Sequence, residues 1–147
     1  MKLWILRHGQ AEAQAPADSL RQLTAAGQKE VLEVMSGLAG EPFEAVLASP
    51  FVRAQQTAEL ACQASGFPGG IITVDWLIPE SDPHSVIGCL EQRSEQNLLL
   101  VSHQPLVSQL ISLLVEGHRR GHYPMPTAGL VCLELDHVAA GLARVIK

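Results

Sequence analysis

The sequence predicts a three-layer α/β fold in which helices cover both faces of a mainly parallel sheet. Short apolar runs of strand length alternate along the chain with longer segments whose apolar residues have helical spacing. An apolar share of 47% against a charged share of 17% is typical of a chain that folds. The length of 147 residues suits one domain of ordinary size, so residues 1–147 are expected to form a single domain.

The first half of the chain is expected to alternate between strand and helix. Its predicted elements are a strand at 2–6, a helix at 25–39, a strand at 45–48 and a helix from 50 to about 65. The strand at 2–6 is apolar almost throughout, as a buried parallel strand is. Thr24 is a favourable N-cap for the helix that follows it. Ser49 and Pro50 are typical of an N-cap and a first helical residue, so they predict where the second helix begins.

The second half follows a break at 66–70 that is rich in Gly and Pro. Its predicted elements are strands at 71–74 and 97–101, helices at 84–92 and 105–115, and a closing pair of strands at 129–135 and 142–146. The strand at 97–101 is the most hydrophobic in the chain. The closing pair is expected at an edge of the sheet, and the segments at 76–83 and 117–126 are expected to be loops.

Charge, hydropathy and cysteine usage exclude several classes of protein. The formal net charge is −5 and there is no basic run, so a nucleic-acid partner is not expected. No apolar stretch approaches the roughly 18 residues that a membrane span needs, and Arg7 follows the first apolar run too soon for an export signal. The three cysteines are far apart, which favours reduced thiols in a cytoplasmic protein over a disulfide framework: Cys62, Cys89 and Cys132.

Two histidines occupy equivalent places at the ends of predicted strands. His8 lies just past the first strand and His103 just past the fourth. Ligands bind at the carboxyl ends of the strands in open α/β sheets, so both imidazoles are expected on one rim. Arg7 precedes His8, and Arg53 lies one turn into the second predicted helix. This set suits a phosphoryl group, because guanidinium forks match phosphate oxygens and a neutral imidazole can attack phosphorus to form a covalent phosphohistidine.

These residues lie in three blocks that resemble the signatures of a known superfamily. Leu6-Arg7-His8-Gly9 resembles the RHG signature of the histidine phosphatase (phosphoglycerate mutase-like) superfamily. The segment at 49–57 resembles its S-P-x-x-R-A-x-Q-T block, and the segment at 101–105 resembles its V-x-H block. Residues 18–24 and 102–107, together with the short length, are similar more specifically to the SixA-type phosphohistidine phosphatases. The likeness spans most of the chain and is weakest toward its C-terminal end.

The resemblance implies a role for each matched residue. His8 would be the nucleophile that carries the phosphoryl group. Arg7 and Arg53 would clamp its oxygens, and His103 would be a second, cationic histidine that faces the transferring group. Additional phosphate contacts are expected from Ser19, from Arg21 and from the backbone N–H of Gln104 at a helix start.

Glu80 leaves two alternatives open. Larger members of the superfamily place a carboxylic proton donor in the loop after the third strand, and Glu80 follows Pro79 in that region. Its register does not clearly match the acid of the family, and SixA-type chains manage without one. Glu80 is therefore either a general acid that contacts the substrate or an exposed loop residue.

No metal or other cofactor is expected. His118 and His122 stand four residues apart, a spacing that can hold a metal ion on a helix. Gly121 lies between them and Pro124 follows, so a solvated loop is the better interpretation.

The resemblance implies a phosphatase that acts on phosphohistidine in another protein, with a histidine-containing phosphotransfer domain as its partner. The same superfamily contains small-molecule phosphatases and sugar-phosphate mutases, but this chain looks too short for segments that enclose a small substrate. A phosphate-binding module without turnover is the alternative from another class. The presence of both His8 and His103 argues against that module, because binding alone could use Arg and Lys.

Overall fold

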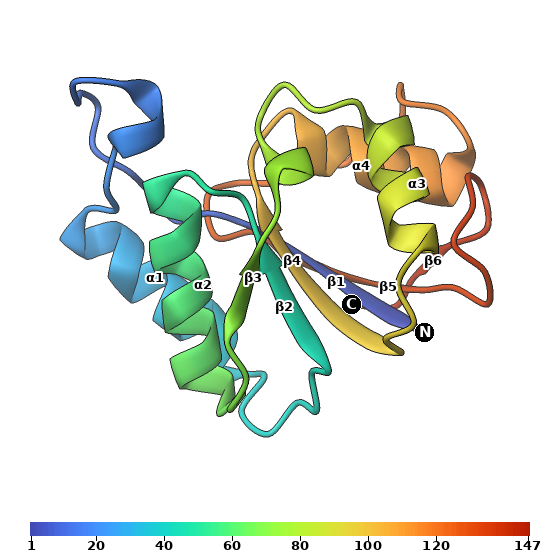
Figure 1. The fold of residues 1–147 in the computed structure, drawn as a ribbon, viewed down its shortest axis with the longest axis horizontal. Coiled ribbons are helices and arrows are strands. Elements are labelled where there is room, and N and C mark those ends of the chain that lie inside the picture. Colours follow the sequence, from blue (N-terminus) through green and yellow to red (C-terminus); the bar gives the residue numbers. More distant parts are fainter.

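The computed structural model describes all 147 residues and shows one six-stranded sheet with helices on both faces (Figure 1). The strands are β1 (Lys2–Arg7), β2 (Ala45–Ala48), β3 (Ile71–Thr73), β4 (Asn97–Ser102), β5 (Leu130–Glu134) and β6 (Arg144–Val145). The α-helices are α1 (Ala25–Ser36), α2 (Val52–Ser65), α3 (Pro83–Glu91) and α4 (Leu106–Glu116). Two short 3-10 helices complete the list: η1 (Asp18–Leu20) and η2 (Asp75–Leu77).

The sheet is parallel over four strands and antiparallel over two. The strand order is β3-β2-β4-β1-β5-β6. The pairs β3–β2, β2–β4 and β4–β1 are parallel, whereas β5 runs antiparallel to β1 and β6 antiparallel to β5. The predicted α/β/α layers with a mainly parallel sheet are therefore confirmed, and the closing pair of strands does end at one edge.

Each face of the central strands buries its own core. In β1, Leu3 and Ile5 pack with residues of α3 and α4, whereas Trp4 and Leu6 pack with residues of α1 and α2. All four side chains are fully or almost fully buried. A strand that alternates between two buried layers must be apolar on both faces, which explains the unbroken apolar runs at 3–6 and 98–101.

The start of α1 agrees with the prediction, and the start of α2 differs from it. Thr24 caps α1 as expected, because its hydroxyl accepts the Gly27 N–H at 3.0 Å. Ser49 does not cap α2: that helix begins at Val52, and its N-cap position has no side-chain hydrogen bond. The hydroxyl of Ser49 accepts the N–H of Phe51, the residue before the helix, and it also contacts His103.

Two loop predictions hold in outline. The segment at 117–126 contains no helix or strand, whereas the segment at 76–83 includes the end of η2 and the first residue of α3.

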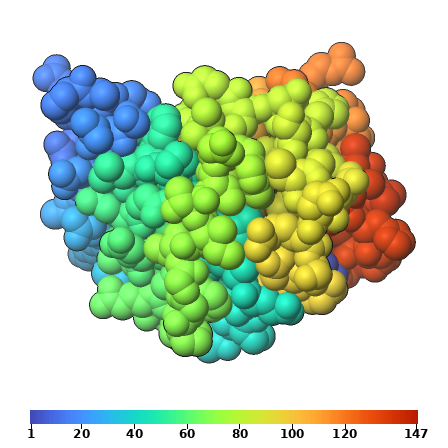
Figure 2. Space-filling model, viewed as in Figure 1, coloured from blue at the N-terminus to red at the C-terminus, as the bar shows by residue number.

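The segment between β1 and α1 carries η1 and projects from the body of the molecule, as the dark blue lobe in Figure 2 shows. No helix has the length and hydrophobicity needed to cross a lipid bilayer.

Candidate active site

The pairing of β1 with β4 brings the two histidines together. Arg7, the last residue of β1, lies opposite Ser102, the last residue of β4. His8 and His103 follow directly, so both imidazoles lie at the carboxyl edge of the sheet. Their ring centroids are 5.2 Å apart and the ring planes are inclined by 58°. Both residues are buried, with 7% and 1% of their surface exposed.

One tautomer of His8 follows from its hydrogen bonds. Nδ1 lies 2.7 Å from the carbonyl oxygen of Gly9. A carbonyl oxygen can only accept, so Nδ1 carries the proton and Nε2 keeps its lone pair. The Gly9 N–H donates to the Thr57 hydroxyl at 3.1 Å, which fixes this turn against α2. Nε2 faces the Arg53 Nε at 3.3 Å.

The surroundings keep His8 neutral. Burial lowers the pKa of His8 to about 4, and the nearby positive charges of Arg53, Arg7 and Arg21 also lower it. The hydrogen bond to the Gly9 carbonyl opposes these effects only in part. At neutral pH the ring is therefore uncharged, which is the form that can attack phosphorus.

Arg53 is held on several sides. It lies in the first turn of α2 and is 4% exposed. Its Nη1 donates to the backbone carbonyl of Asp18 at 2.8 Å, and its Nη2 lies 3.2 Å from the Asp18 carboxylate. The Phe51 ring packs against the guanidinium, 5.0 Å from its carbon to the ring centroid. Asp18 also binds Arg21, whose Nη1 lies 3.0 Å from the other carboxylate oxygen.

Arg7 and His103 each keep a buried nitrogen without a partner. Arg7 donates from Nη1 to the Met125 carbonyl at 2.9 Å, whereas its Nε makes no hydrogen bond within the chain. His103 contacts the Ser49 hydroxyl through Nε2 at 2.7 Å, and its Nδ1 makes none. Buried polar atoms are nearly always satisfied, so these two nitrogens indicate a place for ligand oxygens.

His103 is neutral in this structure, and its expected cationic form beside a phosphoryl group stays a prediction. Burial is the largest of the effects that lower the pKa of His103 to about 3; the neighbouring His8, Arg53 and Arg7 act in the same direction, and Asp18 opposes them. The resemblance suggests a charged ring, but a buried imidazole beside several guanidiniums loses its proton more easily. A phosphoryl dianion bound between these groups would favour the protonated form again.

Of the other predicted site residues, Arg21 lies near the histidines, whereas Ser19 and Glu80 make no hydrogen bond to them. Arg21 lies close enough to affect His8, and it is fixed by a 2.6 Å hydrogen bond from its Nε to the Glu12 carbonyl. Ser19 is half-buried in η1 and makes no hydrogen bond, so the structure does not tie it to the cluster. Glu80 is exposed and makes no hydrogen bond or ion pair.

Gln104 lies just before a helix start, as predicted, and its role as a phosphate contact stays a prediction. The helix α4 begins at Leu106, so the backbone N–H of Gln104 precedes the helix and makes no hydrogen bond within the chain. Its side chain accepts the Ser108 N–H at 3.2 Å and donates to the Met125 carbonyl at 3.3 Å. Gln104 thus connects the start of α4 to the carbonyl that holds Arg7.

Asp18 and Ser49 are the contacts that sequence reasoning missed. Asp18 lies in the polar segment 18–24 and three residues before Arg21, which was the one available signal. Ser49 looked like a helix cap, and only the tertiary fold shows its contact with His103. The two histidines of the 117–126 loop are exposed, and no group of three or more His, Cys, Asp or Glu residues could hold a metal ion.

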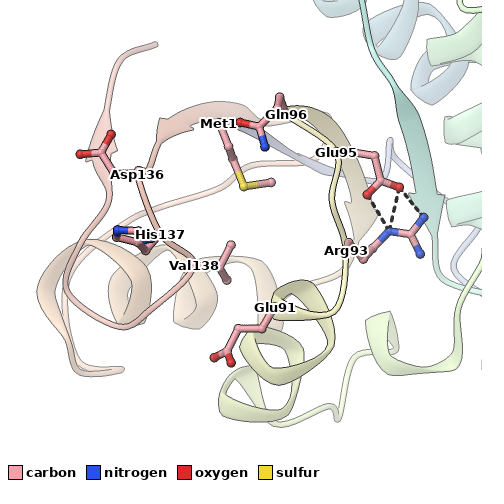
Figure 3. Close-up of a pocket in the computed structure, with 8 residues that line it drawn as sticks. All are labelled: Met1, Glu91, Arg93, Glu95, Gln96, Asp136, His137 and Val138. Carbon is pink, nitrogen blue, oxygen red and sulfur yellow. Dashed lines mark hydrogen bonds and ion pairs between the residues drawn. The ribbon is translucent and has the colours of Figure 1, made fainter.

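The two surface hollows of the molecule lie away from the histidine pair. The larger, of about 380 Å³, lies near the amino ends of β1 and β4 (Figure 3). It is lined by Met1, Glu91, Arg93, Glu95, Gln96, Asp136, His137 and Val138. The smaller lies among polar side chains of α1 and α2. Neither hollow therefore encloses the carboxyl edge of the sheet, where the two histidines lie.

The fold and the site together define a class. A mainly parallel sheet presents a buried pair of neutral histidines, and the Arg53 guanidinium contacts the lone-pair nitrogen of His8. This is the arrangement of an enzyme that handles a phosphoryl group with a histidine.

Comparison with known proteins narrows the class. The profile of the histidine phosphatase superfamily (branch 1) matches residues 3–76. The chain is 32% identical over 146 residues to phosphohistidine phosphatase SixA of Escherichia coli K12, across 96% of this chain and 89% of that protein. It is 33% identical over 145 residues to a SixA homologue of Haemophilus influenzae, across 89% and 88%. A solved structure of the protein histidine phosphatase SixA complexed with tungstate matches with a TM-score of 0.87 at 30% identity, covering 100% of this chain and 95% of that one.

The chain therefore belongs to the histidine phosphatase superfamily and, within it, to the SixA-like phosphohistidine phosphatase family. The matched profile includes the first two motif blocks and ends before Glu80 and His103. The full-length relatives extend the likeness across both of these positions.

Proposed function

We propose that the chain removes phosphate from a phosphohistidine on another protein through a covalent phospho-His8 intermediate. The observation that carries this proposal is the lone pair on His8 Nε2, which faces Arg53 Nε at 3.3 Å. The buried, unpartnered nitrogens of Arg7 and His103 supply donors for phosphoryl oxygens beside it. A nucleophile and fixed donors in one buried site are what phosphoryl transfer needs.

The reaction takes two steps. His8 Nε2 forms a new P–N bond, and the P–N bond to the substrate imidazole breaks, so that its electron pair returns to that nitrogen. The substrate ring keeps a proton on its other nitrogen and departs as neutral imidazole. Water then attacks the phosphorus of phospho-His8, inorganic phosphate leaves, and the electron pair returns to Nε2. Arg7 and Arg53 stabilise the charge on the equatorial oxygens in both steps.

A protein substrate is favoured by the leaving group and by the shape of the site. An imidazole departs more easily than an alkoxide, so a site without a buried carboxylic acid suffices for phosphohistidine. The two surface hollows contain none of the site residues, so nothing in the chain encloses a small substrate. The relatives are named phosphohistidine phosphatases, and one of them holds the oxyanion tungstate. We take a phosphorylated histidine-containing phosphotransfer domain as the partner, in the cytoplasm.

Turnover is proposed to need no metal ion. The guanidiniums of Arg7, Arg53 and Arg21 supply the positive charge that metal ions provide in other phosphatases. Activity should therefore survive exhaustive chelation. Activity lost on chelation and restored by a divalent cation would contradict this part of the proposal.

A substrate series tests the function. We expect wild-type kcat/KM to be highest for a phosphorylated phosphotransfer domain, lower for free phosphohistidine and lowest for alkyl phosphates. His8→Ala should lose turnover by several orders of magnitude and should trap no labelled phosphate, because the nucleophile is gone. The exposed histidine variant His137→Ala is the control and should match the wild type. Equal turnover of all substrates, or a His8→Ala variant within about tenfold of the wild type, would overturn the proposal.

A further inference from the structure

The carboxylate of Asp18 binds two arginines that come from different parts of the chain. One carboxylate oxygen lies 3.2 Å from Arg53 Nη2, and the other lies 3.0 Å from Arg21 Nη1. The backbone carbonyl of Asp18 accepts a third hydrogen bond, from Arg53 Nη1 at 2.8 Å. Arg53 belongs to α2 and Arg21 to the segment before α1, so η1 connects the two through one residue.

These contacts leave a defined edge of Arg53 open toward the nucleophile. A guanidinium is planar, with its two Nη atoms at the end and Nε along one side. Asp18 takes both Nη atoms, whereas Nε points to His8 Nε2 at 3.3 Å. The Phe51 ring covers one face of the plane. Asp18 thus fixes the end of the guanidinium while its Nε side faces the nucleophile.

A carboxylate beside a phosphoryl site could instead occupy the place of the phosphoryl group itself. The contacts argue against that arrangement. Asp18 makes no hydrogen bond to His8, Arg7 or His103, and the Arg7 Nε and His103 Nδ1 remain without partners. A group in the phosphoryl position would lie next to those nitrogens. Asp18 therefore lies beside the phosphoryl position and not in it.

Asp18 is ionised in this environment. The hydrogen bond from Arg21 is the largest of the effects that lower its pKa, and the hydrogen bond and charge of Arg53 act in the same direction. Its side chain is 57% exposed, so the charged carboxylate keeps much of its hydration. Arg21 in turn is anchored to the Glu12 carbonyl through Nε at 2.6 Å.

We propose that Asp18 is a positioning residue for the phosphoryl site, which sets the orientation of Arg53 and joins Arg21 to it. The proposal rests on the proposed function, since it assumes that Arg53 holds phosphoryl oxygens. Asp18 contacts only the arginines and acts through them. Its removal should therefore weaken the grip on phosphate without removing the nucleophile.

The variant Asp18→Asn tests this role, because it keeps the shape of the side chain and removes its charge. We expect the dissociation constant for inorganic phosphate, measured by calorimetry, to rise by about tenfold, since Arg53 and Arg21 lose the charged partner that fixes their orientation. The KM should rise similarly and kcat should change less. Asp75→Asn is the matched control, because Asp75 is the exposed first residue of the other 3-10 helix, and it should leave both constants unchanged.

A double-mutant cycle separates positioning from a purely structural effect. A lysine at position 53 carries a single point charge. Asp18 therefore cannot hold one part of that group while another part faces His8, as it does with the Arg53 guanidinium. In an Arg53→Lys background, Asp18→Asn should therefore lower kcat/KM by less than about twofold, against about tenfold in the wild type. Asp18→Ala is measured as a second substitution at this position. Thermal unfolding of every variant tests whether the fold is retained.

Three results would overturn the proposal. Asp18→Asn could behave as Asp75→Asn does, it could lower kcat/KM equally in both backgrounds, or it could bind phosphate more tightly than the wild type. The last result would mean that the carboxylate competes with phosphate. The wild type is measured in the same series, so failure of the proposed function is visible separately, as absence of phosphate binding and turnover in the unmodified chain.

Discussion

The hydroxyl of Ser49 connects the motif segment at 49–57 to His103. It accepts the Phe51 N–H at 3.2 Å and lies 2.7 Å from His103 Nε2. When the hydroxyl donates its own proton to Nε2, the neutral ring of His103 carries its proton on Nδ1. Nδ1 is the buried nitrogen that has no partner within the chain. Ser49 thereby prepares a donor for a phosphoryl oxygen.

Glu80 provides a test of the leaving-group argument at the scale of one side chain. It is exposed and unpaired, so we expect Glu80→Gln to lower kcat/KM on phosphohistidine by less than roughly tenfold. An alkyl phosphate needs a proton donor for its alkoxide, so any turnover of that substrate should fall more. The measurement is kcat/KM for both substrates in the variant and in the wild type.

A matched control for Glu80→Gln is Glu91→Gln, an exposed acid near the opposite edge of the sheet. It makes the same charge change and should leave both substrates unaffected. A loss of about a hundredfold on both substrates in Glu80→Gln would identify Glu80 as a general acid and would favour a broader phosphomonoesterase.

The site residues that could be predicted are those whose place follows from the strands. His8 and His103 each follow an apolar run, and neighbouring parallel strands end at the same edge. The contacts of Asp18 and Ser49 could not be predicted in this way. Each depends on a partner distant along the chain, Arg53 for Asp18 and His103 for Ser49, and no local pattern encodes that approach.

At the scale of elements, α1 packs directly against the turn that carries His8. A Cβ built on Gly27 would overlap the Gln10 carbonyl, and a Cβ on Gly9 would lie 2.7 Å from the Gly27 carbonyl. We therefore expect Gly27→Ala to destabilise the fold by about 1–3 kcal/mol, although alanine normally favours a helix. Activity should fall as well, because the displaced backbone leads into His8. Chemical unfolding and kcat/KM are the measurements.

Gly88 in α3 is the matched control for Gly27. It is a helical glycine, and a Cβ there would meet no atom within 4 Å. Gly88→Ala should therefore stabilise the chain by up to about 1 kcal/mol and leave activity unchanged. If both variants change stability in the same direction, close packing of α1 on the turn after β1 is not what determines the effect of Gly27→Ala.

The elements themselves were predictable to the extent that their signals are local. Thr24 caps α1 as its sequence indicates, but α1 ends at Ser36 and not at 39. The start of α2 differs from the prediction because the Ser49 hydroxyl binds the Phe51 N–H and His103, and the helix begins only at Val52. The missed cap of α3 is Asp82, whose carboxylate accepts the His84 N–H at 2.9 Å.

At the scale of the whole molecule, alternation of apolar runs and helices predicts the layers and leaves the strand order open. β4 lies between β2 and β1, so the strand that His103 follows pairs with the strand that His8 follows. The hydrophobicity of the strand at 97–101 favours a central place for it, but hydropathy alone does not say which strands are its neighbours. The placement that creates the site is therefore a property of the assembled sheet.

The two buried histidines couple the stability of the whole molecule to pH. Unfolded histidine has a pKa of about 6.5. Burial lowers the pKa of His8 to about 4 and that of His103 to about 3. As the pH falls below 6.5, the unfolded chain therefore binds protons that the folded chain does not. Stability then decreases as the pH falls from about 6.5 toward 4, and these groups contribute no slope above about 7.5.

We expect the free energy of unfolding in urea to be lower at pH 5 than at pH 7.5 by about 2 kcal/mol for each of the two histidines, since one pKa unit corresponds to about 1.4 kcal/mol. The variant His103→Gln cannot bind the proton in either state, so about half of the decrease should disappear. His137→Gln removes a histidine that is exposed at the surface and should leave the decrease as it is in the wild type. Equal stability of the wild type at both pH values, or an unchanged decrease in His103→Gln, would show that the histidine pair is not held neutral by the fold.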